Sequence, residues 1–425
     1  MPTLEQARET ILAALSALSA EVIPTESALG RVAAVSVVAT EDLVPFARSA
    51  MDGFAVRAVD TRGASLGRPC ELRVQGTLFA GTGNAILEET AAIAISTGAP
   101  LPSGADAVIP IEHVQHSDHA IQVHAPAAAG DSVFPAGEDV REGDVLVARG
   151  KALRPAALAL LAFAGNAEVS VYQRPRVSVL ATGNELVEIT AKPKHGQIRN
   201  SNGPALCALA AEAGGEPRIA GVAPDDPAKL SALLEAARRD ADLVVTIGGA
   251  SHGQRDYVKA ALSDLGAEFF FREVAMRPGR PTGFAMWAGV PVFVLPGNPA
   301  AAFVGFHQLV RPALTRLGGH AGVTAPRLPA TLRGEVHGRP GMEYVVFAKA
   351  TLGANGFEAE PLANQCSALV RNAAEANAFI FMPSDAPERS PGAKVEIEIL
   401  DWRSVASGAA MRKKSAEYEA PFAGT

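Results

Sequence analysis

The feature that most constrains the fold is a regular alternation of apolar runs and helical segments between Arg176 and about Leu317. Helices of this segment begin at Asn or Asp turns, often with Pro in the first turn. Strands that alternate with helices of about 10 to 15 residues are typical of a mostly parallel sheet covered on both faces. Ligands of such sheets bind at the carboxyl ends of the strands. The predicted strands are Val177–Leu180, Arg218–Val222, Leu243–Ile247 and Val292–Leu295.

The regions on either side of this three-layer α/β segment have different patterns of apolar and polar residues. From Val44 to about Val140, short apolar runs alternate with Gly, Pro and Asp turns, which is typical of a β-rich domain. A capping box at Thr3–Gln6 and an apolar segment at about 154–165 predict helices on either side of that region. After Pro326, strand-like runs return. The expected division is a mixed, discontinuous N-terminal linker domain (1–43 with 140–172), a β-rich inserted domain (44–139), the α/β domain (173–322), a C-terminal β domain (323–403) and a flexible tail (404–425).

Composition excludes several classes of protein. Hydrophobic residues make up 48% of the 425 residues, which is enough for real cores. A formal charge of −7 without a basic block argues against a nucleic-acid partner. No apolar run reaches the roughly 20 residues that span a bilayer, and the first residues lack a basic, hydrophobic leader. Because Cys70, Cys207 and Cys366 fit neither a disulfide framework nor a zinc ribbon, we expect a cytoplasmic protein with no membrane partner.

The strongest local signal is the turn that follows the predicted strand Leu243–Ile247. Gly248 and Gly249 lead into Ser251 and then into a helix that carries Asp256. Consecutive glycines let backbone N–H groups converge on an anion, and the N-terminus of the following helix adds positive potential. An ordinary strand-to-helix turn contains the same glycines, so both interpretations stay open when this turn is taken alone.

Two later turns hold further candidates for anion binding. Arg277 and Arg280 lie in a stiff Arg-Pro-Gly-Arg-Pro segment, and each guanidinium can bind a phosphate or another oxyanion through two hydrogen bonds. Two solvated surface arginines are the alternative interpretation. Pro296 and Pro299 belong to a tight strand-to-helix turn, for which ligand contact and simple turn formation are equally open.

Acidic residues occur in several of the predicted turns. They are Asp52, Asp139, Glu185, Asp225 and Asp256. Carboxylates near an anionic substrate would repel it unless Mg²⁺ lay between them, and Mg²⁺ prefers one or two carboxylates together with phosphate oxygens and water. Taken singly, each acid also fits a turn or a helix cap, and Asp226 is expected to cap a helix.

Nine short segments, in order along the chain, together resemble one family. The first is Ser49–Val56, the last is Leu295–Pro299, and the likeness spans about residues 1–400. Between them lie Thr97–Pro100, Gly137–Asp139, Thr182–Leu186, Gly196–Ile198, Gly248–Ser251, Asp256–Tyr257 and Arg277–Pro281. The chain resembles the MoeA/gephyrin-E type molybdopterin molybdenumtransferases of molybdenum cofactor biosynthesis.

This resemblance implies an activity and an assembly. Molybdate would be inserted into the dithiolene of adenylylated molybdopterin, with Mg²⁺-assisted cleavage of the pyrophosphate and release of AMP. The central domain would be of the molybdopterin-binding type. Two elongated subunits would form a homodimer, with each cleft between the α/β domain of one subunit and the β-rich domain of the other. A contact with the molybdopterin adenylyltransferase is a further implied partnership.

The resemblance also implies roles for individual residues. Those expected to reach the cleft from the partner side are Asp52, Thr97 and Asp139. Those expected to hold Mg²⁺ or to orient the pterin phosphate are Glu185, Asp225 and Asp256, with Glu185 and Asp256 as the metal ligands. Those expected to receive the anionic ligand are Gly248, Gly249, Ser251, Arg277, Arg280, Pro296 and Pro299.

Departures from the family pattern leave the choice of oxyanion open. Relatives usually have lysines at Arg277 and Arg280, and often a lysine at Glu273. Some relatives hold molybdate with an arginine in a C-terminal strand, where this chain has Val346 and its neighbours. Residues that could complete the oxyanion pocket instead are Gln365, Ser367 and Arg371. Two alternatives to the transferase are a non-catalytic pterin-binding scaffold or carrier and a molybdopterin adenylyltransferase.

Overall fold

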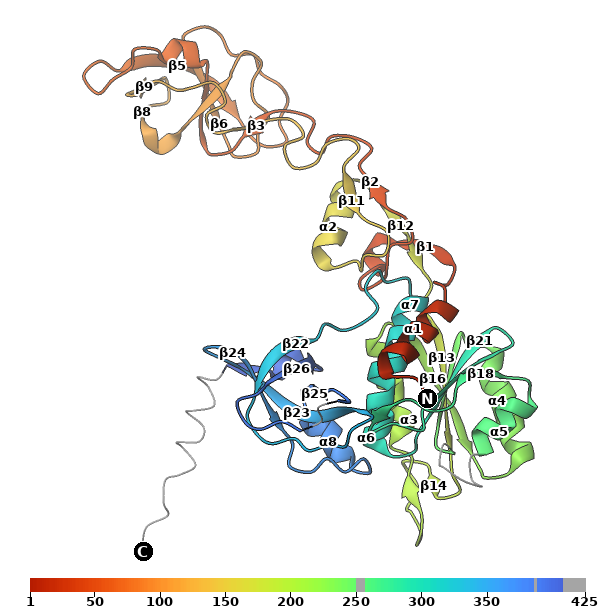
Figure 1. Ribbon diagram of the computed structural model, residues 1–425. Coiled ribbons are helices and arrows are strands. Elements are labelled where there is room, and N and C mark those ends of the chain that lie inside the picture. Colours follow the sequence, from red (N-terminus) through yellow and green to blue (C-terminus); the bar gives the residue numbers. More distant parts are fainter. Residues whose placement is uncertain (250–256, 386–387, 408–425) are drawn as a thin grey trace, which may run out of the picture.

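The chain folds into an elongated molecule of four parts (Figure 1). The computed structural model describes residues 1–249, 257–385 and 388–407. The β-rich domain lies at one end, the linker domain follows, and the α/β and C-terminal β domains lie side by side at the other end. This confirms the multidomain α/β plus β architecture. Ser251, Asp256 and residues 408–425 of the expected tail lie outside the described residues.

A six-stranded sheet forms the centre of the α/β domain. Its order is β16-β13-β17-β21-β20-β18, and the first three pairings are parallel. The last two pairings are antiparallel, so two strands that the sequence analysis did not identify extend the predicted sheet at one edge. The strands are β13 (Arg176–Thr182), β16 (Glu216–Ala223), β17 (Leu243–Ile247), β18 (Glu268–Phe271), β20 (Gly283–Trp287) and β21 (Val290–Leu295).

Helices cover both faces of this sheet, and each face has its own apolar core. The helices α4 and α5 lie on one face, while α3, α6, α7 and α1 lie on the other. Asp226 caps α4 as predicted, because its carboxylate accepts a hydrogen bond from the Lys229 N–H at 3.0 Å. The helices are α1 (Leu4–Ala14), α3 (Asn202–Glu212), α4 (Pro227–Arg239), α5 (Tyr257–Asp264), α6 (Pro299–Gly305) and α7 (Arg311–Leu317), with a π-helical segment (Phe306–Val310) between the last two.

Helix α1 packs on the α/β domain, although residues 1–43 were expected to belong to the linker domain. The predicted capping box at Thr3–Gln6 is confirmed, and the helix buries Leu4, Ala7 and Ile11 in the core beside α7. These three residues recur at helical spacing and so form one apolar stripe. The stripe needs an apolar partner to be stable, and the surface of α7 supplies it.

A buried polar network joins α1, the π-helical segment and the C-terminal domain. Arg8 Nε donates to the Gln308 carbonyl at 3.0 Å, and Gln308 Nε2 donates to Glu398 at 2.9 Å. Arg311 lies 3.3 Å from the same Glu398 carboxylate. Because Arg8, Gln308 and Glu398 are all less than a tenth exposed, each needs these partners to offset its desolvation. The network therefore fixes how the three elements lie relative to one another.

His307, next to this network, is expected to make stability depend on pH. Its ring packs edge-on against Phe379 at 5.5 Å, and Nδ1 lies 3.3 Å from Arg311 Nη1. Burial, together with the Arg311 charge, lowers the pKa of His307 from 6.5 to about 3. The unfolded chain binds a proton below pH 6.5 that the folded chain does not. Through His307 alone, the free energy of unfolding is unaffected above pH 6.5. Below that pH it falls by about 1.4 kcal/mol per pH unit, down to about pH 3.

Urea unfolding at pH 7.5 and pH 5.0 measures this effect. The His307→Gln variant removes the titrating ring, so between these two pH values it should lose about 2 kcal/mol less stability than the wild type. The quantity compared is the difference in the free energy of unfolding between the two pH values in each protein. A loss of stability that the Gln substitution causes equally at both pH values therefore cancels. An equal pH dependence in the two proteins would contradict the assignment.

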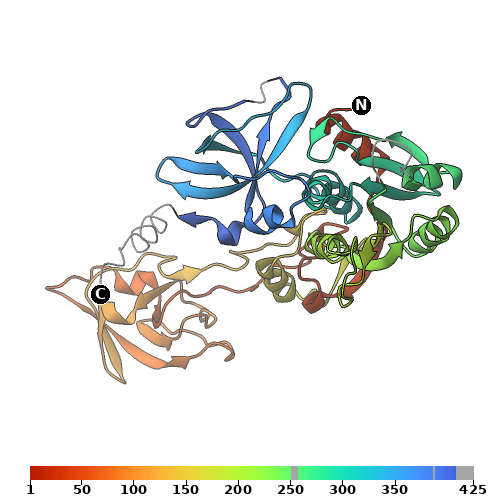
Figure 2. The same ribbon diagram turned by 90° about the horizontal axis from the view of Figure 1, so that it is seen from below.

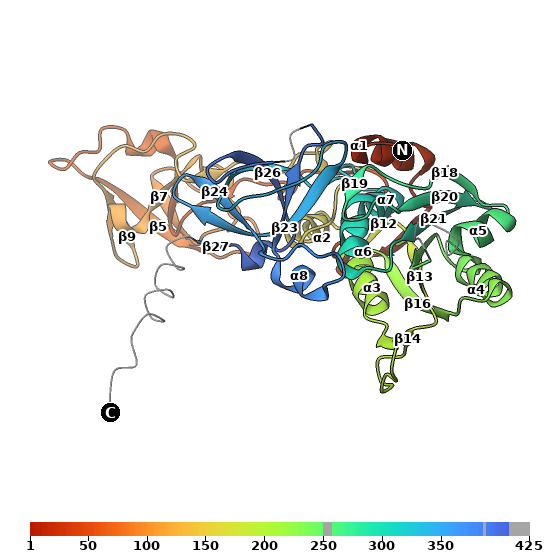
Figure 3. The same cartoon turned by 60° about the horizontal axis from the view of Figure 1, so that its bottom comes forward.

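The C-terminal domain is a sheet that closes on itself. Its order is β23-β24-β22-β26-β25, and β25 pairs again with β23. One further strand, β19 (Met276–Arg277), comes from the α/β domain and pairs with β23, while α8 (Val370–Glu375) lies beside α6 (Figure 3). Figure 2 shows the closed sheet next to the α/β domain. The strands are β22 (Leu328–Leu332), β23 (Glu343–Gly353), β24 (Gly356–Pro361), β25 (Ala378–Met382), β26 (Lys394–Ile399) and β27 (Ala406–Ser407), the last of which pairs with β23.

The linker and β-rich domains complete the described chain. In the linker, α2 (Pro155–Phe163) lies beside the ribbons of β1 (Ala20–Pro24) with β12 (Glu168–Tyr172) and β2 (Val37–Val38) with β11 (Val145–Val147). The β-rich domain contains the ribbon of β3 (Arg48–Ser49) with β10 (Val133–Phe134) and a sheet of order β7-β4-β6-β5-β9-β8. The strands of that sheet are β4 (Gly53–Val56), β5 (Cys70–Leu78), β6 (Ala91–Ile95), β7 (Ala107–Pro110), β8 (Val114–His116) and β9 (Ala120–Val123).

The two chain segments that enter and leave the β-rich domain run side by side. Leu43 N–H donates to the Val140 carbonyl at 3.0 Å, and Gly137 N–H donates to the Val44 carbonyl at 3.2 Å. The β-rich domain is therefore attached through a paired double connection. Across the described ranges of the chain, no helix combines the length and the apolarity needed to cross a bilayer.

Candidate active site

The carboxyl ends of β13, β17 and β21 meet at one end of the α/β sheet and border a cavity of about 750 Å³. Its lining comes from the turns that follow β13, β16, β17 and β21 and from the first residues of α3, α5 and α6. The paired strands β14 (Leu186–Val187) and β15 (Ile198–Arg199), together with Pro281, Ala368 and Val370, complete it. The position is the one predicted for a parallel sheet. Six of the residues predicted from the sequence line this cavity, namely Glu185, Asp225, Gly248, Gly249, Pro296 and Pro299.

Two acidic loops border the cavity, and they are connected to each other. Gly183 has a φ of +143°, and a Cβ there would lie 2.5 Å from a carboxylate oxygen of Glu185. The positive φ favours glycine here, and a larger residue would push the Glu185 carboxylate away from its position over the loop. Asn184 Oδ1 accepts a hydrogen bond from the Asp225 N–H at 3.1 Å, which joins this loop to the one after β16. Two carboxylates from separate strands thus line one cavity.

Gly248 lets the ends of β13 and β17 approach closely. Its φ is +96°, and a Cβ would lie 2.5 Å from the Thr182 carbonyl oxygen, so a larger residue would force the strands apart. The Gly248 N–H donates to the Leu295 carbonyl at 3.0 Å. Gly248 therefore contributes space and a turn, while its N–H is used within the fold. Gly249 also lines the cavity, and the rest of the predicted glycine turn lies outside the described residues.

A set of polar residues at the start of α3 was not predicted from the sequence. Asn202 Nδ2 donates to the Gly297 carbonyl at 2.8 Å and so connects this junction to the turn between Pro296 and Pro299. Asn200 is buried, and its side chain accepts a hydrogen bond from the Gly203 N–H at 3.0 Å. The signal for them was a run of four polar residues directly before a predicted helix. These cavity-lining residues are Arg199, Asn200, Ser201 and Asn202.

The two predicted arginines line a second cavity, which adjoins the first. This cavity has a volume of about 1070 Å³, lies between the α/β and C-terminal domains, and shares Pro281, Pro296 and Asn298 with the first. Arg277 is exposed there, with its guanidinium carbon 5.9 Å from the centre of the Tyr344 ring. The predicted ligand-binding residues are thus divided between two contiguous cavities.

Glu273, a departure from the family pattern, has a clear partner. Its carboxylate lies 3.0 Å from Arg280 Nη2, so the charge of Arg280 is balanced within the chain. Arg277 forms no ion pair with the described residues, and neither does Arg339, which also lines the second cavity, so both are stronger cations there than Arg280. A ligand oxyanion there would meet Arg277 without first displacing a carboxylate.

The residues considered as substitutes for a molybdate-binding arginine have different surroundings. Gln365 accepts a hydrogen bond from the Phe347 N–H at 3.0 Å and donates to the Phe347 carbonyl at 2.9 Å, so its amide is used to hold β23. Ser367 lines the second cavity and accepts a hydrogen bond from Asn298 Nδ2 at 3.3 Å. Arg371 pairs with Glu375 on α8 and lines neither of these two cavities.

The remaining candidates lie far from both cavities within one chain. Thr97 donates to Asp52 Oδ1 through its N–H at 2.7 Å and through its hydroxyl at 3.1 Å, so the structure brings these two residues together. Asp139 is exposed in the segment that joins β10 to β11. The whole linker domain separates the β-rich domain from the α/β sheet (Figure 1).

Family comparisons cover most of the chain. The model "MoeA N-terminal region (domain I and II)" matches residues 2–165. A "probable molybdopterin binding domain" matches residues 178–316, which include both acidic loops. The "MoeA C-terminal region (domain IV)" matches residues 329–400.

Individual relatives agree with these matches. A molybdopterin molybdenumtransferase of Staphylococcus aureus (strain Mu50 / ATCC 700699) is 34% identical over 94% of this chain and 95% of its own length. A molybdopterin biosynthesis MoeA protein from Pyrococcus horikoshii has a crystal structure that matches with a TM-score of 0.80, at 36% identity over 94% of this chain and 99% of that one. A second structure, from strain OT3, matches with a TM-score of 0.83 at 29% identity, over 94% of this chain and 100% of that one. The chain therefore belongs to the MoeA family of molybdopterin molybdenumtransferases.

Proposed function

We propose that this chain inserts molybdate into adenylylated molybdopterin and releases AMP in a Mg²⁺-dependent reaction of molybdenum cofactor biosynthesis. The observation that supports this most is the placement of Glu185 and Asp225 in one cavity at the strand ends of the domain that matches the molybdopterin-binding model. A diphosphate-linked nucleotide needs both a counterion and fixed hydrogen-bond donors. The two contiguous cavities offer carboxylates in one and the Arg277 guanidinium in the other.

The donor chemistry of the first cavity fits Mg²⁺. Glu185 would hold the ion, with Asp256, which lies outside the described residues, as the second ligand, and Asp225 would orient the pterin phosphate. Bound there, the ion would neutralise the phosphate oxygens and improve AMP as a leaving group. No group of three or more His, Cys, Asp or Glu that could hold a metal ion occurs within residues 1–249, 257–385 and 388–407. A site of one or two carboxylates that leaves positions for water and phosphate agrees with the preference of this ion.

The residues of the chain itself would bind and orient both reactants. Arg277 presents paired N–H donors to an oxyanion in the second cavity, and such a fork favours a planar or tetrahedral oxyanion in a fixed orientation. The turns at Gly248 and Pro296 are held by backbone hydrogen bonds and need little rearrangement when the ligand binds. Pre-ordered donors of this kind lower the barrier by positioning the reacting groups.

The proposal includes a homodimer. Asp52 and Thr97 form a paired polar site on the far domain, and a second subunit placed antiparallel to the first would bring that site to the cavities of its partner. It also includes a cytoplasmic location, since Cys70, Cys207 and Cys366 are all free thiols, which a reducing compartment maintains. A contact with the adenylyltransferase that makes the substrate is part of the same proposal.

Release of AMP from adenylylated molybdopterin tests the proposed reaction. Purified protein with Mg²⁺ and molybdate should release about one AMP per substrate consumed, and omission of Mg²⁺ should abolish the release. Parallel reactions with tungstate show which oxyanion the second cavity selects. No AMP under conditions in which the S. aureus relative is active would contradict the proposal.

Parallel assays of substrate binding and of ATP consumption distinguish the proposed transferase from a pterin-binding scaffold and from an adenylyltransferase. A pterin-binding scaffold would bind the adenylylated substrate tightly and release no AMP. An adenylyltransferase would consume ATP and adenylylate free molybdopterin. The long flanking domains and the paired Asp52 and Thr97 favour the molybdenumtransferase, since they lie outside the α/β domain.

A further inference from the structure

The second cavity contains an arginine that was not predicted from the sequence. Arg339 lies in the loop of residues 333–342 between β22 and β23, is exposed, and lines the cavity together with Arg277. Neither guanidinium forms an ion pair with the described residues, whereas Arg280 is paired with Glu273. An oxyanion in this cavity would therefore meet two cations that have no carboxylate partner in the described part of the chain.

One side chain, Tyr344, contacts both of these arginines. Its hydroxyl accepts a hydrogen bond from the Arg339 N–H at 2.9 Å. The centre of its ring lies 5.9 Å from the Arg277 guanidinium carbon, within the range of a cation–π contact. This second contact follows from strand pairing, because Arg277 of β19 is in register with Tyr344 of β23. A single tyrosine thus holds the backbone of one arginine and the guanidinium of the other.

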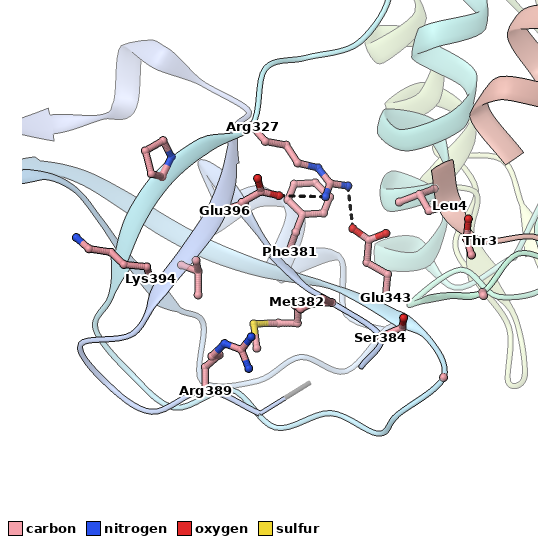
Figure 4. Close-up of a pocket in the computed structure, with 15 residues that line it drawn as sticks. Thr3, Leu4, Arg327, Glu343, Phe381, Met382, Ser384, Arg389, Lys394 and Glu396 are labelled. Atoms are coloured by element: carbon pink, nitrogen blue, oxygen red, sulfur yellow. Dashed lines mark hydrogen bonds and ion pairs between the residues drawn. The ribbon is translucent and has the colours of Figure 1, made fainter. Parts of the chain in front are cut away.

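The start of β23 is anchored, so Tyr344 is held in this position. Glu343, the residue before it, lies 2.8 Å from Arg327, which also pairs with Glu396 at 3.4 Å. Figure 4 shows Arg327 between these two carboxylates. The Glu343 N–H donates to the Ala275 carbonyl at 2.9 Å, which attaches the strand to the α/β domain. The strand that carries Tyr344 is therefore fixed to both domains.

The loop that carries Arg339 is held on both sides of this residue. Before it, Val336 exchanges two backbone hydrogen bonds of 3.0 Å with Arg389. After it, the Gly341 N–H donates to the Ser384 carbonyl at 2.9 Å. Because the backbone is already fixed on both sides, less conformational entropy is lost when the Arg339 side chain binds a ligand.

The carboxylates of this cavity have basic residues beside them. Among the described lining residues, the acids are Glu335 and Glu360. Glu335 Oε2 lies 3.4 Å from His337 Nε2, a contact that becomes an ion pair when the ring is protonated. Glu360 of β24 stands directly opposite Lys349 of β23, and opposite charges in such positions attract each other. These acids therefore oppose an anion at the arginines less than isolated carboxylates would.

We propose that Arg339 and Arg277 together bind the oxyanion substrate, and that Tyr344 positions both of them. This inference rests on the proposed transferase function, since it names the groups that would hold molybdate in that reaction. Each guanidinium offers paired N–H donors, so two of them from separate segments can bind two edges of one tetrahedral oxyanion. Arg339 would supply from a loop the charge that some relatives place in a C-terminal strand, where this chain has Val346.

Isothermal titration calorimetry of the full chain with molybdate, in the absence of pterin, tests this site. We expect saturable binding, and Arg339→Gln should weaken the dissociation constant about tenfold or more, because it removes a charged hydrogen-bond donor. Arg339→Lys keeps the charge without the paired donors and should lose less. The matched control is Arg333→Gln in the same loop. Arg333 is exposed, pairs with Glu358 and does not line the cavity, so this variant should stay within twofold of the wild type.

The positioning role of Tyr344 has a measurement of its own. Tyr344→Phe keeps the ring beside Arg277 and removes the hydroxyl that holds Arg339, so it should weaken the dissociation constant about threefold or more. In an Arg339→Gln background the same change should have no further effect, because the hydroxyl acts through the Arg339 guanidinium. An equal loss in both backgrounds would show a merely structural effect and would remove Tyr344 from the proposal.

Three results would overturn the role of Arg339. They are equal molybdate affinity of the wild type and Arg339→Gln, an equal loss in Arg333→Gln, and no saturation up to millimolar molybdate, with circular dichroism and melting temperature showing that each variant folds. The transferase proposal is judged separately. Molybdate binding through Arg339 without AMP release would contradict only the transferase. AMP release with the same half-saturating molybdate concentration in the wild type and Arg339→Gln would contradict only this inference.

Discussion

A heterodimer of one Asp52→Ala subunit and one Glu185→Ala subunit is expected to release AMP at about half the rate of the wild-type dimer. Each homodimer of these variants should be nearly inactive. If each active site takes Asp52 from one subunit and Glu185 from the other, the heterodimer contains one site with both residues intact and one with neither. Co-expression with two different affinity tags and purification on both tags isolates this species, and the measured quantity is AMP released per dimer.

The matched control places both changes in one subunit and pairs it with a wild-type subunit. With sites shared between subunits, each site of this dimer lacks one residue, so it should be nearly inactive. With sites confined to one subunit, the two results exchange: the control would keep about half the activity and the first heterodimer would have none. The pair of heterodimers therefore decides between the two arrangements, even if each variant is somewhat unstable.

Glu185→Gln is expected to lower the rate of AMP release by about a hundredfold or more, because it removes a charge from the cavity and keeps the shape of the side chain. The loss should be greater at low Mg²⁺ than at saturating Mg²⁺ if the carboxylate holds the ion. Glu185 is exposed in its loop, so the melting temperature should change little. AMP release measured at several Mg²⁺ concentrations gives both quantities.

The control for this prediction is Glu188→Gln. Glu188 is exposed, lies three residues after Glu185 on the far side of the short strand β14 (Leu186–Val187), and does not line the cavity, so the activity of this variant should stay within twofold of the wild type. A similar loss in both variants would show that the loop responds to any lost charge. Full activity of Glu185→Gln would remove Glu185 from the proposed reaction.

Local patterns were enough to predict the centre of the fold. The strands β13, β17 and β21 are mostly apolar, buried runs that are followed by Gly183, Gly248 and Pro296, and the cap at Asp226 is a local hydrogen bond. The antiparallel strands β18 and β20 escaped prediction because no helix follows them to complete an alternating unit. The position of α1 escaped prediction for a different reason. Its partners, such as Gln308, lie about 300 residues away, and nothing local to Thr3–Ala14 specifies them.

In the candidate site, too, some residue positions could be predicted from local sequence patterns and others could not. Glu185, Asp225 and Gly248 could be predicted because each follows a strand of one parallel sheet, whose ends must meet. The separation of Arg277 from these residues could not be predicted. It depends on β19 pairing with β23, which comes from another domain more than 60 residues later. The placement of Asp52 relative to the cavity depends on a second subunit and stays a prediction.

The paired connection at Leu43 and Val140 has a consequence for how such proteins can diverge. Because the chain leaves the linker domain and returns to it at adjacent points, removal of the segment between these points would leave two ends close enough for a short turn. The outer arm can thus be lengthened, shortened or exchanged by a single event in the gene. Its host domain would keep the same strands and the same hydrophobic core.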